Sequence, residues 1–265
     1  MSCPYAWMRL LARCLRHAAP ALLSVTSLVL GWEAYAQFSG ISPTALPAPS
    51  RVILQGFEQR EALVRHSLAT LQATTFGFAC SLMAAFLFSV LIDFFRPLRR
   101  ALFPVLIITQ TLPLVAIAPL IVLWFGFGLT PKIVLVALVT FFPMLVALVQ
   151  GYDATDRDIA ALLGSMGASR WRIFAMARLP SALPYFFAGL RISITYAVVA
   201  AIFAEYAGAA QGLGIYILNA KNNFRPDLVL AAVLVSSTLT LLLFGASALV
   251  QRAALPWVRL AETRP

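Results

Sequence analysis

Residues able to do nucleophilic, acid–base or metal chemistry are few and widely spaced in this sequence. The only histidines are His17 and His66, and the three cysteines are Cys3, Cys14 and Cys80. A zinc site needs Cys, His or carboxylate ligands at close, recurring spacing, and no such cluster occurs. An enzyme active site would likewise need His, Asp or Glu gathered at one place. We therefore expect no catalytic residue, no metal and no bound cofactor.

Two charged residues, Arg191 and Glu205, interrupt a long apolar run. They are about 21 Å apart along a helix at 1.5 Å per residue, so they cannot pair with each other. A charge inside a membrane segment suggests a functional role, here on a polar path across the membrane. Each also lies near an end of the run, where its side chain could extend to water instead. Gln110 and Thr111 are uncharged candidates for the same path, with an interhelical hydrogen bond as the alternative.

The composition indicates that lipid surrounds much of this chain. Apolar residues make up 61% and charged residues 11%, against roughly 45–50% and about 25% in soluble domains. The net charge of +10 would suit nucleic acid. However, the basic residues lie in the short connections between apolar runs, where membrane topology requires them. Nucleic-acid binding is therefore not expected.

Six segments are long and apolar enough to cross a bilayer as helices, which takes about 20 residues. The third is interrupted by Pro113 and Pro119, which a packed bundle tolerates because neighbouring helices satisfy the freed backbone groups. The sequence thus predicts an all-α membrane protein, a bundle of six transmembrane helices. The segments are residues 19–36, 70–93, 102–125, 131–150, 183–205 and 227–250.

The distribution of basic residues predicts the orientation. With the N-terminus inside, the cytoplasmic segments carry thirteen arginines and the outer segments carry six basic residues. The positive-inside rule then places both termini in the cytoplasm. The expected divisions are a cytoplasmic N-terminus (1–18), a first transmembrane helix (19–36), an outer loop (37–66), a transmembrane core (67–250) and a cytoplasmic C-terminus (251–265).

The N-terminal region has a second interpretation, a cleaved signal peptide. Its basic residues, its apolar run and Ala34-Tyr35-Ala36 resemble a signal with a small-x-small cleavage site. Cleavage would leave five spans. The long stretch before the apolar run, and Trp32-Glu33 close to the cut, favour an uncleaved span. After it, the prolines between Ser42 and Ser50 predict an extended outer connection.

The segment Asp153 to Pro180 is a long cytoplasmic insert with its own order. Thr155 and Asp158 fit a capping box. Apolar residues then recur at helical spacing, and Gly167 is placed to end this helix. Ser169 can cap a second short helix, which Leu179-Pro180 would close. The apolar residues are Ile159, Leu162, Leu163 and Met166. Such a helix pair either rests on lipid headgroups or docks a cytoplasmic partner.

The stretch Gly164 to Pro184 resembles the coupling loop of permeases of binding-protein-dependent ABC importers. That motif reads Glu-Ala-Ala, three residues, Gly, nine residues, Ile-x-Leu-Pro. Gly167, Leu179 and Pro180 match it, whereas Ala161 replaces the acid and Ala177 the isoleucine. The resemblance implies an ATPase-coupling loop formed by Ala161, Leu162, Leu163, Gly167, Ala168, Ser169, Arg170, Trp171, Leu179 and Pro180.

Further blocks of the chain resemble the nitrate, sulfonate and taurine branch of these permeases. They are Trp32-Glu33, Leu46 to Pro49, Gln110 to Gly126 and Glu205 to Gly214. Two more, Leu129 to Pro143 and Ser165 to Trp171, resemble permeases for the pyrimidine precursor of thiamine. A sulfonate-, nitrate- or taurine-type anion is the alternative substrate.

The resemblance implies a non-catalytic, multi-pass subunit of a bacterial inner membrane, in contact with membrane lipid. The sequence agrees, because it contains no Walker A pattern and neither lysine follows a glycine-rich loop. The implied partners are a cytoplasmic ABC ATPase, a periplasmic or lipid-anchored substrate-binding protein and a second permease chain, as a homodimer. Gln110, Thr111 and Glu205 are then candidates for the translocation path of a small organic solute.

An ion-coupled secondary transporter is the alternative class. It would need an intramembrane carboxylate as a proton or ion relay, and Glu205 is the strongest candidate. This interpretation leaves the order of residues 153–180 unexplained.

Overall fold

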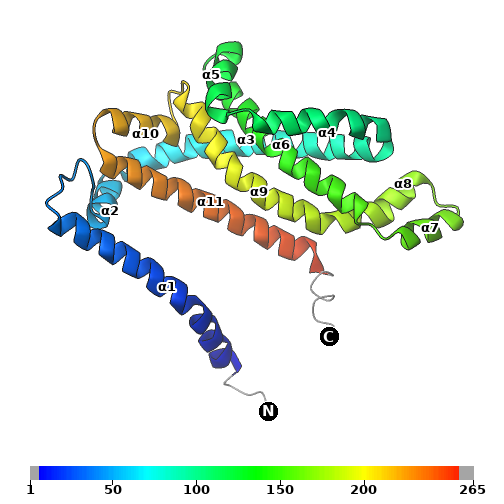
Figure 1. Ribbon diagram of the computed structural model, residues 1–265, viewed down its shortest axis with the longest axis horizontal. Helices are drawn as coiled ribbons and strands as arrows, with labels where there is room; N and C mark the ends of the chain where they lie inside the picture. The colour runs from blue at the N-terminus through cyan, green and yellow to red at the C-terminus, as the bar shows by residue number, and fades with distance from the viewer. Residues whose placement is uncertain (1–5, 257–265) are drawn as a thin grey trace. The chain divides into compact units, whose positions relative to one another are not determined.

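The computed structural model describes residues 6–256, and every regular element in that range is helical (Figure 1). The chain forms two compact units, a smaller one from the residues up to Arg60 with Ala220–Ala231, and a larger one from Glu61–Asn219 with the residues from Ala232. The elements are α1 (Ala6–Phe38), α2 (Pro49–Glu58), α3 (Arg60–Phe94), α4 (Arg96–Thr111), α5 (Leu114–Phe125), α6 (Leu129–Asp153), α7 (Arg157–Ser165), α8 (Arg170–Ile173), the π-helical turn η1 (Phe174–Arg178), α9 (Leu179–Tyr206), α10 (Leu213–Asn222) and α11 (Pro226–Ala254).

Four helices in the described range are long and apolar enough to cross a membrane: α3, α6, α11 and the continuous run Arg170–Tyr206. The predicted third span, residues 102–125, is instead two helices, α4 and α5, bent by 102° at their junction. Pro113 explains the bend. It lacks a backbone N–H and holds Leu112 in an extended conformation, with φ −72° and ψ 129°. Counting the bent pair as one span gives five.

The predicted first span, residues 19–36, lies within α1. Among the described residues, α1 is not one of the helices that meet the spanning criteria. Its apolar run is diluted by hydroxyl and charged side chains, including Ser24, Thr26 and Glu33. The six-span count therefore stays a prediction. Residues 1–5 and 257–265 of the two predicted terminal segments lie outside the described range.

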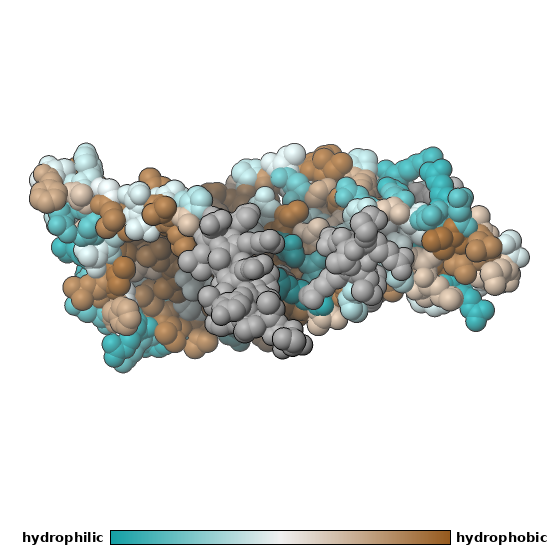
Figure 2. Space-filling view, turned by 90° about the horizontal axis from the view of Figure 1, so that it is seen from below, coloured by the Kyte–Doolittle hydropathy of each residue, from teal (hydrophilic) through white to brown (hydrophobic). Residues whose placement is uncertain are grey.

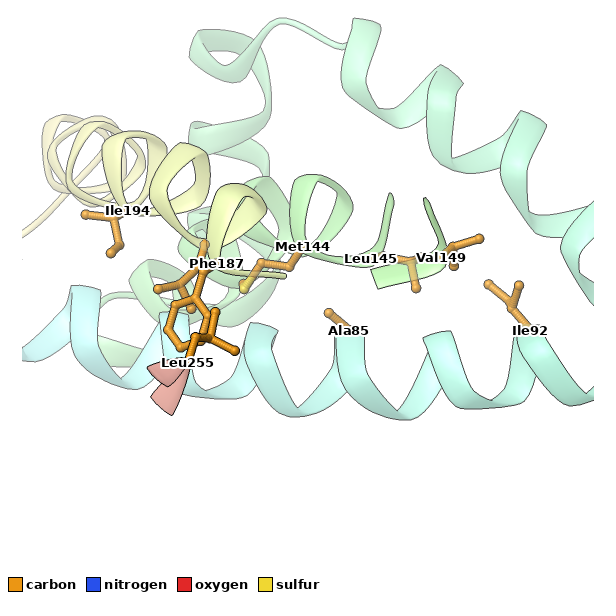
Figure 3. Packing of buried hydrophobic residues seen from close by; sticks show 9 residues of the cluster. Ala85, Ile92, Met144, Leu145, Val149, Phe187, Ile194 and Leu255 are labelled. Atoms are coloured by element: carbon orange, nitrogen blue, oxygen red, sulfur yellow. The ribbon is translucent and has the colours of Figure 1, made fainter. Parts of the chain in front are cut away.

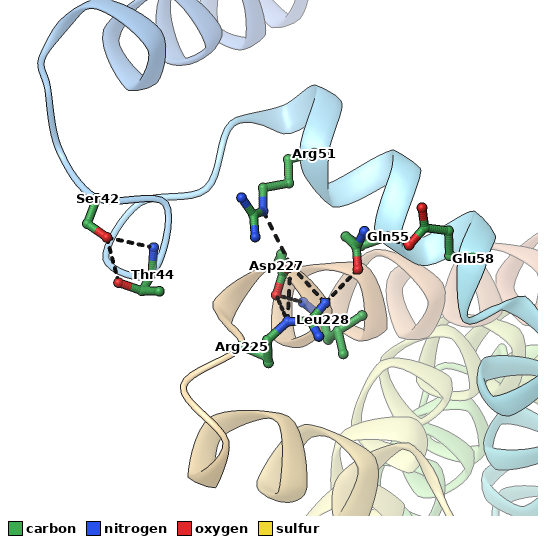
Figure 4. Close-up of polar contacts among 8 residues, drawn as sticks. All are labelled: Ser42, Thr44, Arg51, Gln55, Glu58, Arg225, Asp227 and Leu228. Carbon is green, nitrogen blue, oxygen red and sulfur yellow. Dashed lines mark hydrogen bonds and ion pairs between the residues drawn. The ribbon is translucent and has the colours of Figure 1, made fainter.

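The predicted outer loop, residues 37–66, is more helical than the sequence suggested. Pro49 and Ser50 begin α2, so the expectation of an extended segment over 42–50 is wrong at its end. Proline suits the first turn of a helix because the N–H that it lacks would have no partner there. Within the smaller unit, Asp227 lies 3.5 Å from Arg51 and 3.0 Å from Arg225 (Figure 4). These contacts join α2 to the start of α11.

The core of the larger unit lies between α3, α6 and α9; α6 and α9 run side by side, and α3 crosses them (Figure 1). Small residues bring α6 and α9 together. A Cβ atom on Gly151 would stand 2.5 Å from the Cα of Ala182, and one on Gly189 would collide with Ala147. Such contacts are typical of membrane helices whose backbones pack closely. A cluster of buried apolar side chains fills the space alongside them (Figure 3): Ala85, Ile92, Met144, Leu145, Val149, Phe187, Leu190, Ile194 and Leu255.

Candidate functional site

The predicted insert between two spans folds as α7, a tight turn and α8. Asp156, not Thr155, caps α7: its carboxylate accepts a hydrogen bond from the N–H of Asp158 at 2.8 Å. The capping box predicted from Thr155 and Asp158 is therefore wrong by one residue. Thr155 instead belongs to the turn that ends α6, where its N–H donates to the carbonyl of Tyr152 at 3.3 Å.

Gly167 ends α7, as the sequence predicts. Its φ of +78° is a left-handed conformation that glycine adopts at little cost. The N–H of Gly167 donates to the carbonyl of Gly164, and that of Ala168 to the carbonyl of Leu163, both at 3.0 Å. This pair of bonds is a Schellman motif. Ser169 then caps α8 as predicted, accepting from the N–H of Arg172 at 3.3 Å.

The expected close of the insert at Leu179-Pro180 does not occur. Helix α8 continues through η1 into α9, and Arg170–Tyr206 is one run of 37 residues. Pro180 cannot donate a hydrogen bond to the preceding turn, which would normally break a helix. The wider π-helical turn at Phe174–Arg178 accommodates the missing bond at this position. The second short helix is therefore the first part of a membrane-spanning helix.

Aromatic side chains pack the junction of α8, η1 and α9 against the rest of the larger unit. Phe174 is buried, at 2% exposure. Its ring centroid lies 5.2 Å from that of Tyr152, 5.5 Å from Trp171 and 5.7 Å from Phe94. These rings come from the ends of α3 and α6 and from α8, so the three elements meet at one point. Offset and edge-on aromatic pairs of this kind stabilise by about 0.5–1.5 kcal/mol each beyond the area they bury.

Ion pairs surround the same junction. Arg178 of η1 pairs with Asp93 at the end of α3. Arg99 of α4 makes two hydrogen bonds, of 3.0 and 2.7 Å, to the carboxylate of Asp153 at the end of α6. A bidentate pair fixes the mutual orientation of both groups as well as their distance. The loop is thus tied to α3, and α4 is tied to α6, by charged contacts.

Apolar side chains on α7, at its C-cap and on α8 leave more than half of their surface exposed, although one side of the Trp171 ring packs on Phe94 and Phe174. Ile159 is 51% exposed, Leu162 61%, Met166 76% and Trp171 61%. Figure 2 shows apolar residues beside hydrophilic ones at the end of the molecule that carries α7 and α8. No described residue covers this face. Ala161, Ser169 and Arg170 are also exposed, whereas Leu163, Ala168, Leu179 and Pro180 are half-buried.

Glu205 lies at the opposite end of α9, in a closed polar network. Its side chain is 0% exposed, so the alternative that it extends to water is wrong. The hydroxyl of Thr70 lies 3.0 Å from both carboxylate oxygens. The N–H of Gly214 donates to the carboxylate at 2.8 Å, and the Lys132 ammonium lies 3.6 Å away. A buried carboxylate needs several such donors to offset its lost hydration.

The partners of Glu205 also hold the turn that precedes α10. Lys132 donates to the carbonyl of Gln211 at 2.7 Å, and Thr70 accepts from the N–H of Leu213 at 2.8 Å. The Nδ1 atom of His66 lies 2.9 Å from the carbonyl oxygen of Gly212. The network therefore fastens α9, α3, α6 and this turn together. This network was hard to predict from the sequence, because Thr70 and Lys132 lie far from Glu205 along the chain.

The other polar candidates have simpler surroundings. The Arg191 guanidinium donates to Gln251 of α11 at 2.5 Å and lies 5.6 Å from the ring centre of Phe244. Gln110 and Thr111 are exposed at the end of α4, just before the bend. The hydroxyl of Thr111 donates within its own helix, to the carbonyl of Ile108 at 2.8 Å. No group of three His, Cys, Asp or Glu residues within the described range could hold a metal ion.

Comparison with known proteins identifies the chain as an ABC importer permease. Residues 71–255 match the family of binding-protein-dependent transport system inner membrane components, and the chain belongs to this family. Membership implies an ATPase and a substrate-binding protein as partners. It also removes the support for an ion-coupled secondary transporter.

Individual relatives cover almost the whole chain. The formylaminopyrimidine transport permease of Halalkalibacterium halodurans is 34% identical over 90% of this chain and 95% of its own length. The riboflavin transport permease of Chloroflexus aurantiacus is 35% identical, over 90% and 91%. The taurine transport permease of Escherichia coli is 28% identical, over 91% and 90%. These names agree with the branch that the sequence blocks indicated.

A solved transporter shares the fold. The structure of the MetNI methionine ABC transporter in inward-facing conformations aligns with a TM-score of 0.60 and 19% identity. The alignment covers 73% of this chain and 94% of that chain. The aligned part of the chain therefore has the fold of a chain of a known ABC transporter.

Glu205 gives a direct test of the buried network. We expect Glu205→Gln to destabilise the protein by about 3–5 kcal/mol, because Lys132 stays buried without its carboxylate. Adding Lys132→Met removes the stranded charge, so the double variant should lose less stability than the two single losses combined. Unfolding of the purified protein in detergent measures the loss of stability in Glu205→Gln, in Lys132→Met and in the double variant.

Glu61→Gln is the matched control, since Glu61 is exposed in the first turn of α3. It should shift the unfolding midpoint little. Strict additivity of the Glu205 and Lys132 variants would show that the pair does not interact.

Proposed function

We propose that the loop between α6 and α9, residues 153–180, is where a separate cytoplasmic ATPase drives this permease. One observation carries the proposal. The last part of the loop is continuous with a candidate membrane-spanning helix, Arg170–Tyr206, and no flexible linker separates the two. A partner that moves α8 therefore moves α9 directly. The exposed apolar face of α7 and α8 supplies a surface for that partner.

Docking at this surface depends on packing more than on charge. Ala161 stands where the family motif has an acid, so an ion pair from that position is absent. Leu162, Met166 and Trp171 instead present more than half of their side-chain surface. Burying a large apolar side chain contributes about 1.5–3 kcal/mol. The partner surface should accordingly contain an apolar groove that accepts these side chains.

In the proposed mechanism the membrane helices have two conformational states, and the ATPase and the transported solute each shift the equilibrium between them. ATP binding would close a pair of ATPases and draw the docked loops together, while the delivered solute favours one state of the membrane helices. Gln110 and Thr111, exposed at the bend between α4 and α5, are proposed to face the translocation path between two permease chains of a homodimer. Glu205 stays a candidate for the path, but its enclosed carboxylate favours a role through the turn that it anchors.

The proposed setting is a bacterial inner membrane, with six spans, both termini in the cytoplasm and lipid around the bundle. The arginines of the loop, Arg157, Arg170, Arg172 and Arg178, support this orientation by the positive-inside rule. The substrate-binding protein, free in the periplasm or lipid-anchored, would then meet the opposite face. Asn219, Asn222 and Asn223 lie at or beside the end of α10, which this orientation places outside.

The proposed substrate is a pyrimidine precursor of thiamine, with a sulfonate, nitrate or taurine as the alternative. The identity to the formylaminopyrimidine permease, 34%, exceeds that to the taurine permease, 28%, and is about equal to that to the riboflavin permease, 35%. We expect cells that express the complete importer to accumulate labelled formylaminopyrimidine at least tenfold faster than labelled taurine. The reverse preference would assign the chain to the sulfonate and taurine group.

Gly167→Val tests the coupling role of the loop. Valine disfavours the left-handed conformation, with φ +78°, so the turn between α7 and α8 should be distorted. A Cβ atom here would meet nothing within 4 Å, so the effect is local to the turn. We expect ATP-driven uptake to fall at least tenfold at equal membrane abundance.

Gly164→Val is the matched control. Gly164 also has open space around it, but it carries no positive φ because it lies inside α7. Its variant should transport at a near-normal rate. Normal uptake by Gly167→Val at equal abundance would refute the coupling role of this turn.

A further inference from the structure

A cavity of about 780 Å³ lies in the larger unit, where α3 and α6 end and α4 begins. Its wall is mixed in character. Ile92, Phe103 and Val149 make one part apolar, and charged side chains make the rest polar. The charged residues that line it are Asp93, Arg99, Arg100, Asp153, Arg170 and Arg178.

The charges in this wall do not cancel. Four arginines face two aspartates, which leaves an excess of two positive charges. Each aspartate already has a partner, because Asp93 pairs with Arg178 and Asp153 with Arg99. The excess therefore belongs to Arg100 and Arg170.

These two arginines line the cavity without a carboxylate partner among the described residues. Arg170 donates to the carbonyl of Phe94 at 3.2 Å, and its guanidinium lies 5.3 Å from the centre of the Phe94 ring. These contacts hold its position while leaving other N–H groups available. Arg100 is exposed and makes no hydrogen bond or ion pair within the described chain. The pair thus offers one fixed and one free guanidinium.

We propose that this cavity binds the phosphate headgroup of an anionic phospholipid. Guanidinium groups match phosphate oxygens in geometry and charge. The apolar wall suits the glycerol and the first acyl carbons, which a free inorganic anion lacks. Basic pockets between helices on the cytoplasmic side are where acidic headgroups bind, and the assignment rests on the cytoplasmic placement proposed for this face.

A lipid held here would bridge two elements that otherwise do not share a charged contact. Arg100 belongs to α4 and Arg170 to the start of the helix that contains α9. A phosphate between them would restrain the loop against the bent α4–α5 pair. The lipid would then change how freely the loop moves without touching the apolar docking face of α7.

Native mass spectrometry of the full-length permease, without ATPase, tests the site. We expect dioleoyl phosphatidylglycerol to bind more tightly than dioleoyl phosphatidylcholine. Arg100→Gln should weaken phosphatidylglycerol binding roughly fivefold, and Arg100→Gln with Arg170→Gln roughly twenty-fivefold, from about 1 kcal/mol per arginine. Arg100→Gln is the safer variant for folding, since this side chain has no partner to lose.

Arg172→Gln is the matched control, because Arg172 is exposed on the same short helix but does not line the cavity. It should bind phosphatidylglycerol like the unchanged protein. Equal binding of the two lipids, or an equal loss in Arg172→Gln, would overturn the site. Displacement of phosphatidylglycerol by inorganic phosphate at the same concentration would overturn the lipid assignment. None of these outcomes depends on the ATPase. The lipid site and the proposed coupling role of the loop are therefore tested independently.

Discussion

The helix from Arg170 to Tyr206 is the element on which the rest of this structure depends. A loop outside the membrane can drive helices inside it only if a stiff connection joins the two. Here the π-helical turn at Phe174–Arg178 supplies that connection, because it carries the chain past Pro180 without a break. The aromatic contacts of Phe174 with Tyr152 and Phe94 then fix the position of this connection against α6 and α3.

Both ends of this helix are anchored, by different physical means. At the loop end, aromatic rings and the Asp93–Arg178 ion pair hold it against α3 and α6. At the other end, the buried Glu205 accepts hydrogen bonds from Thr70 of α3 and from the N–H of Gly214 in the first turn of α10, and it lies 3.6 Å from Lys132 of α6. Between them, α6 and α9 approach so closely at Gly151 and Gly189 that no side chain fits. The proposed coupling accordingly implies that a motion applied to α8 would reach α6 and α9 together.

Local features of the loop were predictable because short-range geometry decides them. Gly167 and Ser169 act as the sequence suggested, since a helix end or cap involves only neighbouring residues. The cap of α7 was predicted at Thr155 instead of Asp156 because both residues suit an N-cap and they are adjacent. The π-helical turn and the partners of Glu205 were not predictable. Thr70 lies 135 positions from Glu205, and only the packing of α3 on α9 brings them together.

The central claim is that the loop drives the membrane helices through a rigid connection. Glycines at the exposed positions Ala175 and Met176 of η1 would loosen that connection without removing a docking side chain, since glycine weakens a helix by about 1 kcal/mol per position. The control has two glycines in place of the exposed Leu241 and Leu242 of α11. The measurement is the number of substrate molecules imported per ATP hydrolysed by the assembled importer. A several-fold fall for the η1 variant alone, with normal ATPase association, is the predicted result, and an unchanged ratio would contradict the account.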